Sequence, residues 1–137
     1  MKGFPLLLKA LRVAVIGVLL IVSLTACGRS KSLKISMDAN GLVTVTPNIV
    51  KLPKDKTEVE VTVSTDITVT DTYPNPGHVN IWRDGQPFLD VQLNRKQKPV
   101  KTGDHLTHTD TAKFTAGTYT LDLDGAKLPP TFSVTAS

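Results

Sequence analysis

Residues 79–93 read VNIWRDGQPFLDVQL, and this stretch decides the fold class. Apolar residues recur at every second position on both sides of a turn signal, Asp84-Gly85. Because successive side chains of a strand point to opposite faces, the alternation predicts two antiparallel strands that share one buried face. The stretch is therefore expected to form a β-hairpin.

The length of the hairpin turn decides which residues lie opposite each other. A turn loop of odd length over residues 84–86 sets Ile81 opposite Leu89 on one face and Trp82 opposite Phe88 on the other. A two-residue turn sets Ile81 opposite Phe88 and Trp82 opposite Pro87 instead, which mixes the apolar and polar pattern. The apolar pattern favours the turn loop of odd length.

The same period of two recurs from Leu33 to the end of the chain, and no segment there offers a helical stripe. Turn signals separate short runs at intervals of about eight to twelve residues. The alternating runs include Leu33, Ile35 and Met37; Val43 and Val45; Val59, Val61 and Val63; Tyr119, Leu121 and Leu123; and Phe132 and Val134. Such a chain is expected to be an antiparallel β-sandwich or barrel.

Three stretches resemble bacterial immunoglobulin-like domains. Residues 43–63 resemble the first two strands of such a domain, the first of them kinked at a proline. Residues 79–88 resemble the third strand and its turn. Residues 116–121 resemble the tyrosine-corner strand, with Tyr119 as the corner residue. The resemblance implies an all-β, immunoglobulin-like antiparallel β-sandwich of about seven to nine strands over residues 33–137. No disulfide is expected, because the chain has one cysteine.

One residue departs from the immunoglobulin-like pattern. The buried tryptophan of that pattern falls at Ile81 here, and Trp82 comes one position later. If Ile81 faces the core, then Trp82 faces outward together with Asn80 and His78. With Phe88, Asp90 and Gln92 on the same face, these residues predict an apolar patch rimmed by polar groups, which is a candidate contact surface. The alternative is that a neighbouring strand or loop covers the tryptophan.

The first 24 residues have the order of a secretory signal. Residues 1–12 carry three cations and no acid, and residues 13–24 form an apolar run broken only by Gly17 and Ser23. A permanent transmembrane helix is the alternative, but crossing the bilayer takes about 20 apolar residues. We therefore expect a cleaved leader.

The residues Leu24-Thr25-Ala26-Cys27 resemble the lipobox of bacterial lipoproteins. The resemblance implies that residues 1–26 are a signal peptide, that the Cys27 thiol carries lipid, and that residues 27–32 are the lipidated cysteine and a short tether. Gly28, where an Asp favours the inner membrane, implies the outer membrane in a Gram-negative host and otherwise the outer face of the cell membrane. The alternative is an ordinary signal peptide with a chance cysteine.

The net charge of +4 comes largely from the leader. Lys2, Lys9 and Arg12 lie there, so the exported part has 13 Lys and Arg against 12 Asp and Glu. An exported domain with such balanced charge is not expected to bind nucleic acid.

A local cationic segment stands out from this balance. It consists of Arg95, Lys96, Lys98 and Lys101. On a membrane-tethered domain it is a candidate contact for anionic lipid headgroups, lipopolysaccharide or a wall polymer. The alternative is a solvated loop between two strands.

Two kinds of chemistry find weaker support. A metal site of histidine and carboxylate ligands would use His78, His105, His108 and Asp110, and the alternative is that these are surface histidines. For catalysis, the chain lacks a Gly-x-Ser-x-Gly turn, and the paired carboxylates Asp122 and Asp124 lie beside a turn where they aid solubility. We expect neither an enzyme nor a bound cofactor.

The sequence therefore predicts a lipoprotein of the cell envelope, bound to the membrane through Cys27. Its domain is expected to be a non-enzymatic binding module for an envelope protein or glycan. The alternative function is an envelope metal-binding protein.

Overall fold

The computed structural model describes residues 30–136. The chain divides into two units, Met1–Ser30 and Lys31–Ser137. The predicted leader, the lipobox and Cys27 lie outside the described residues. Among the described residues, no helix is long and apolar enough to cross a membrane.

The described residues form nine strands and no helix. The strands are β1 (Ser30–Met37), β2 (Val43–Thr46), β3 (Ile49–Lys51), β4 (Glu58–Thr68), β5 (His78–Arg83), β6 (Gln86–Gln92), β7 (His105–Thr115), β8 (Gly117–Leu123) and β9 (Ala126–Thr135). The first strand begins at Ser30, whereas the alternation had placed its start at Leu33. The expected all-β class is confirmed.

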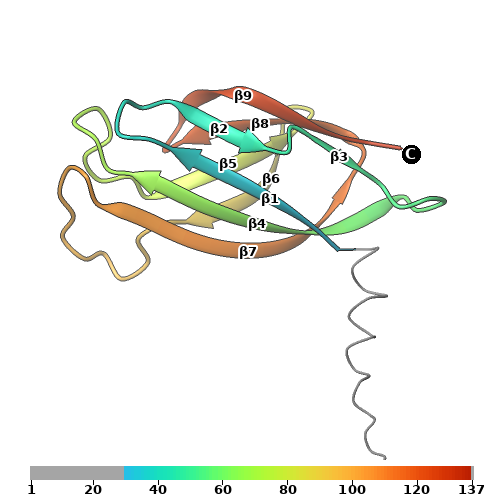
Figure 1. Cartoon of the computed structure of the whole chain (residues 1–137), viewed down its shortest axis with the longest axis horizontal. Helices are drawn as coiled ribbons and strands as arrows, with labels where there is room; N and C mark the ends of the chain where they lie inside the picture. The colour runs from blue at the N-terminus through green and yellow to red at the C-terminus, as the bar shows by residue number, and fades with distance from the viewer. Residues whose placement is uncertain (1–29, 137) are drawn as a thin grey trace, which may run out of the picture. The chain divides into compact units, whose positions relative to one another are not determined.

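The strands form two sheets that face each other in a β-sandwich (Figure 1). The four-stranded sheet has the order β2-β1-β4-β7, and the five-stranded sheet has the order β3-β9-β8-β5-β6. The prediction of a purely antiparallel sandwich is wrong in two places: β3 pairs with β9 in parallel at one edge, and the neighbouring strands β1 and β4 run in the same direction (Figure 1). The β3–β9 pair arises because the chain crosses to the other sheet after β2 without reversing direction, and β1 and β4 are parallel because both run opposite to the β2–β3 segment that connects them (Figure 1).

The core lies between the sheets and is built from the inward half of each alternating pattern. In β4 the buried residues Val59, Val61 and Val63 alternate with exposed or half-buried polar residues. Four aromatic rings, those of Phe88, Phe114, Tyr119 and Phe132, pack together with centroids 4.7 to 6.2 Å apart. Such tilted and stacked contacts add to the gain from apolar burial.

The hairpin of residues 79–93 combines features of both predicted registers. Ile81 lies opposite Leu89, as the apolar pattern predicted, but Trp82 lies opposite Pro87. The turn has two residues, Asp84 and Gly85, both with positive φ, and a β-bulge follows. The extra residue of the bulge is Phe88, and it restores the apolar register after the short turn.

The two ends of the sandwich differ in what they carry. The start of β1 lies at one end, and the loops formed by residues 38–42, 69–77, 93–104 and 124–125 gather at the other (Figure 1). We call this loop-bearing end the distal end. Since β4 and β7 each have 11 residues, the ends are about 36 Å apart at about 3.3 Å per residue.

Tyr119 connects two strands through its hydroxyl group. The side chain is fully buried, and its hydroxyl donates a hydrogen bond of 2.6 Å to the backbone carbonyl of Thr115, four residues upstream. This bond stabilises the turn between β7 and β8. A fully buried carbonyl that loses its donor costs about 1–3 kcal/mol, and the half-buried Thr115 is expected in the lower part of that range.

We expect Tyr119→Phe to lower the free energy of unfolding by about 1–2 kcal/mol, since it removes the donor and keeps the ring. Urea denaturation followed by fluorescence measures the change. Tyr73→Phe is the control, because the Tyr73 hydroxyl makes no hydrogen bond to the described residues. Equal stability of the two variants would contradict this role for the hydroxyl.

Candidate functional site

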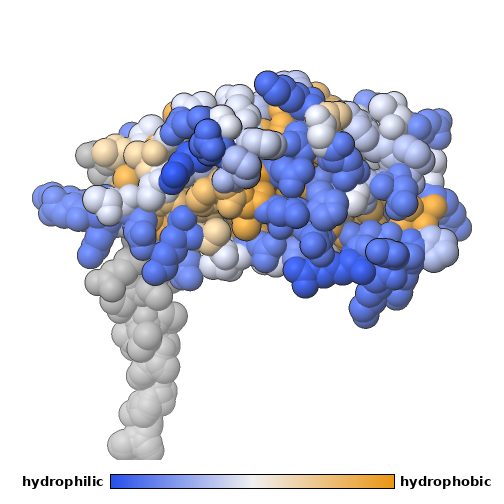
Figure 2. Space-filling model, turned by 180° about the vertical axis from the view of Figure 1, so that it is seen from behind, coloured by the Kyte–Doolittle hydropathy of each residue, from blue (hydrophilic) through white to orange (hydrophobic). Residues whose placement is uncertain are grey.

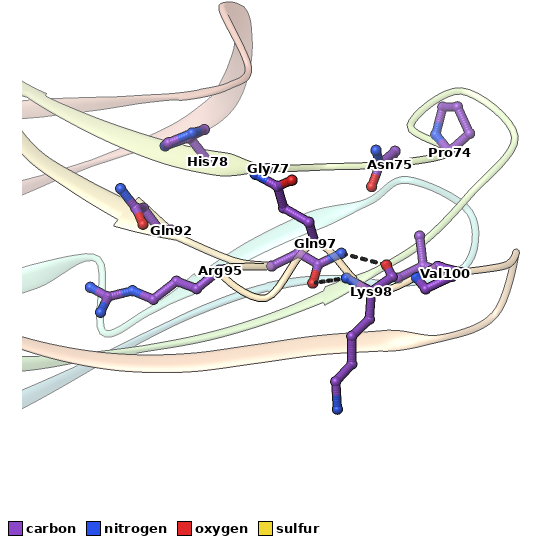
Figure 3. A pocket seen from close by; sticks show the side chains of 11 residues that line it. Pro74, Asn75, Gly77, His78, Gln92, Arg95, Gln97, Lys98 and Val100 are labelled. Carbon is purple, nitrogen blue, oxygen red and sulfur yellow. Dashed lines mark hydrogen bonds between the residues drawn. The ribbon is translucent and has the colours of Figure 1, made fainter.

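A polar hollow of about 730 Å³ opens at the distal end between the β4–β5 and β6–β7 loops (Figure 3). Its lining residues are Pro74, Asn75, Gly77, His78, Gln92, Asn94, Arg95, Gln97, Lys98, Pro99 and Val100. The lining thus combines side-chain amides with cations, and none of these residues carries a carboxylate. We call this feature the distal hollow.

The two cations of the distal hollow are solvent-accessible. Arg95 and Lys98 are exposed, and neither forms a salt bridge with any described residue. Figure 3 shows both side chains extending from the loop while Gln97 reaches toward Gly77. The positive charge at this site is therefore available to a ligand.

Asn94 fixes the loop that carries these cations. Its side-chain amide donates to the Lys98 carbonyl at 2.9 Å, and its side-chain oxygen accepts from the Lys98 amide at 3.1 Å. The Gln97 backbone amide donates to the Asn94 carbonyl at 3.0 Å. These three bonds close a turn over residues 94–98 and define its backbone path.

The opposite wall is held by Asp124, from the turn between β8 and β9. Its two carboxylate oxygens accept hydrogen bonds of 2.9 Å from the backbone amides of Gly77 and His78. The Leu93 amide in turn donates to the Gly77 carbonyl at 2.8 Å and joins both loops. The distal hollow is thus built on three connected segments.

His78 is oriented by an acid on the neighbouring strand. Its Nδ1 lies 2.7 Å from the Asp90 Oδ1 atom, and both side chains are about half exposed. The pair sits on the outer face of the five-stranded sheet, beside the distal hollow.

Trp82 also lies on this outer face, and it is half-buried. Its indole Nε1 donates to Asp122 at 2.5 Å. The same carboxylate accepts from the Asn80 side chain at 2.8 Å and from the Gly125 amide at 2.9 Å. Trp82 is therefore held in a fixed orientation and, being half-buried, presents part of its surface.

Asp122 is a buried acid on an outer face, with 5% of its surface exposed. Burial favours the neutral form and raises its pKa, but the hydrogen bonds from Asn80, Gly125 and Trp82 stabilise the ionised form more strongly. The pKa of Asp122 consequently lies below its usual value.

Phe88 does not lie beside Trp82 as a second outward ring, so that part of the predicted patch is wrong. The bulge turns the Phe88 ring inward, where it packs 4.7 Å from the Phe114 ring and 5.3 Å from the Tyr119 ring, centroid to centroid. A shallow hollow of about 210 Å³ remains next to Trp82. Its lining includes Asn80, Trp82, Pro87, Phe88 and Asp90.

The predicted cationic segment is only partly gathered into the site. Arg95 and Lys98 line the distal hollow, whereas Lys96 and Lys101 are exposed beside it. The amides of Asn75, Asn94 and Gln97 were missed, because loop amides follow no periodic pattern. Their position next to prolines and other turn formers was the signal available.

The four residues of the predicted metal site do not come together. His78 lies on the outer face of the five-stranded sheet, and His105 lies on the outer face of the four-stranded sheet, where its Nδ1 is 2.7 Å from Asp66. His108 and Asp110 take the inward positions of β7, with Nε2 and Oδ2 3.6 Å apart. No group of three or more His, Cys, Asp or Glu among residues 30–136 is arranged to hold a metal ion.

No protein-family model matches the chain, and no curated protein matches its sequence. The chemistry of the distal hollow and the adjoining face is therefore the basis for assigning a function.

We expect Asp122→Asn to weaken the pH dependence of stability. Because the folded-state pKa is lowered, the ionised carboxylate stabilises the fold above the unfolded pKa of about 3.9, and this contribution is lost as the pH falls through the lower folded value. Denaturation between pH about 5 and 2 should show a shallower loss in the variant. Asp55→Asn, in the exposed β3–β4 turn, is the control, and equal slopes in wild type and Asp122→Asn would contradict the assignment.

Proposed function

We propose that this protein is a lipid-anchored component of the cell envelope whose immunoglobulin-like domain is a non-enzymatic binding module, with the distal hollow as its ligand site. The observation that carries the proposal is the set of unpaired cations and amides in a hollow at the end of the sandwich opposite the start of β1. Such convergent polar groups on a rigid scaffold suit recognition of a polar ligand.

The leader and the lipobox support the anchor. Two residues, Gly28 and Arg29, lie between Cys27 and Ser30, and the three residue steps from Cys27 to Ser30 span roughly 10 Å at most. The lipid would thus attach near the end of the sandwich where β1 begins, and the distal hollow would face away from the anchoring membrane. In a Gram-negative host Gly28 favours the outer membrane, and otherwise the anchor is the outer face of the cell membrane.

Two features of the sandwich support the immunoglobulin-like assignment. The edge strand β3 continues from β2, crosses to the second sheet and pairs in parallel with the last strand, β9. The Tyr119 hydroxyl bonds back to the backbone of Thr115, as the tyrosine corner requires. The domain departs from the pattern at β1, which is inserted between β2 and β4.

The chemistry of the distal hollow supports binding over catalysis. Its amides and cations hold and orient polar groups, and no serine, threonine, tyrosine or cysteine lines it that the His78–Asp90 pair could activate as a nucleophile. A protein or glycan of the envelope is the partner class that this location provides.

We expect Cys27→Ser to release the protein from the membrane fraction, because a hydroxyl cannot form the thioether to the lipid. Fractionation and mass spectrometry of the native product test this. The wild type should lack residues 1–26 and carry the added mass of lipid on Cys27. An unmodified cysteine with the leader still attached would refute the lipoprotein assignment.

We expect Arg95→Ala/Lys98→Ala to reduce retention of the full-length protein on isolated cell-envelope material by about tenfold or more, because each cation near an anionic ligand contributes up to about 1 kcal/mol. Lys34→Ala/Lys54→Ala is the control of equal charge, since both lysines are exposed and lie outside the distal hollow. Equal losses in the two variants would indicate nonspecific attraction and count against the site.

A further inference from the structure

The distal hollow continues into a row of polar side chains along the hairpin of β5 and β6. On β5, Trp82, Asn80 and His78 occupy alternate positions and face outward, since Val79 and Ile81 are buried. On β6, Asp90 lies opposite Asn80 and Gln92 lies opposite His78. These five outward residues form what we call the β5–β6 strip.

The strip joins the two hollows into one extended surface. The shallow hollow contains Trp82, Asn80 and Asp90, the distal hollow contains His78 and Gln92, and the His78–Asp90 pair lies between them. From Trp82 to His78 the strip runs about 13 Å at about 3.3 Å per residue. Together with the distal hollow it is long enough for a chain of several units.

Figure 2 views the molecule from the side of the five-stranded sheet. Apolar surface appears near the middle of this face, with hydrophilic residues on both sides, and the right-hand end, where the distal loops lie, is mostly hydrophilic. A ligand on this face therefore meets apolar and polar surface along one path.

The hydrogen-bonding groups left over along the strip suit hydroxyl groups. Asn80 uses one N–H on Asp122 and keeps a second N–H and its carbonyl oxygen. Asp90 engages one oxygen with His78 and keeps the other as an acceptor. Gln92 is exposed and offers both a donor and an acceptor. A hydroxyl is donor and acceptor at once, so a polyhydroxylated ligand can satisfy these mixed groups.

Trp82 adds an apolar platform at one end of the strip. Its Nε1 is engaged with Asp122, which fixes the ring before any ligand arrives. The C–H face of a sugar ring is apolar and stacks on an indole. A fixed ring loses little entropy on binding and therefore contributes more to affinity.

Arg95 and Lys98 supply positive charge at the other end of the path. None of the residues that line the distal hollow is acidic, and the nearby carboxylate of Asp124 is engaged by the Gly77 and His78 amides. Arg95 and Lys98 are therefore the charged side chains that an entering anion meets first. Guanidinium and ammonium groups bind carboxylate or phosphate through charge-assisted hydrogen bonds.

We propose that the β5–β6 strip and the distal hollow together bind an acidic glycan, with sugar hydroxyls along the strip and a carboxylate- or phosphate-bearing unit in the distal hollow. This inference rests on the proposed binding function and adds the ligand class. The distal hollow lies at the end of the sandwich away from the start of β1, and so away from the proposed anchor. This position favours a polymer of the envelope as the ligand over the headgroups of the anchoring membrane.

The test uses the full chain purified in detergent and an array of uronate-bearing, phosphate-bearing and neutral oligosaccharides, with phosphatidylglycerol vesicles as a separate arm. Wild type should bind one or both acidic classes more tightly than neutral chains, and the two acidic arms distinguish carboxylate from phosphate. Arg95→Ala/Lys98→Ala should remove the preference for acidic chains and reduce the dependence of binding on salt.

Trp82→Ala should lower affinity about tenfold for acidic and neutral chains alike, because stacking is independent of charge. Gln92→Ala serves as a second strip variant that disturbs no hydrogen bond between described residues, and it should weaken binding without changing thermal stability. Lys34→Ala/Lys54→Ala is again the control of equal charge.

Binding to vesicles alone, or no binding to any acidic glycan, would overturn the inference. If the envelope material still retains the wild type through Arg95 and Lys98 while the acidic glycans fail, the proposed binding function stands and only the ligand class is wrong. If both fail, the distal hollow is not a binding site.

Discussion

Every strand of this domain must deliver alternate side chains to one shared core, and the rest of the structure depends on that constraint. A one-residue slip in any strand would turn its apolar residues to solvent. In the hairpin of β5 and β6, a two-residue turn alone would produce such a slip. The bulge at Phe88 prevents it, because the extra residue restores the register and places its own ring among Phe114, Tyr119 and Phe132.

The same constraint determines the surface that is left for binding. Because Ile81 takes the inward position, Trp82 must face outward, and its polar N–H finds a partner in Asp122. The carboxylate is itself buried and depends on three donors to stay ionised. One network thus stabilises the sheet and orients the aromatic platform of the β5–β6 strip.

The distal end shows how loops become a defined surface without regular structure. The side chains of Asn94 and Asp124 act as local cross-links between backbone groups of different segments. These bonds replace the ladder hydrogen bonds that a strand would supply, so the loop that carries Arg95 and Lys98 has a set path.

The sequence by itself determined the all-β class and most of the core, because a period of two in apolar residues is a local property of the chain. Val59, Val61 and Val63 illustrate it, since alternate residues of a strand share one face of the sheet and here all three are buried. It also yielded the pairing of Ile81 with Leu89 and the tyrosine of the β7–β8 turn. Only the tertiary structure decided that Phe88 turns inward and that β3 pairs in parallel with β9. It also decided that the histidines lie on separate faces, and that Asn75, Arg95 and Lys98 line one hollow together with His78. These outcomes depend on contacts between segments far apart in the chain, where bulges, edge crossings and loop cross-links leave no periodic mark on the sequence.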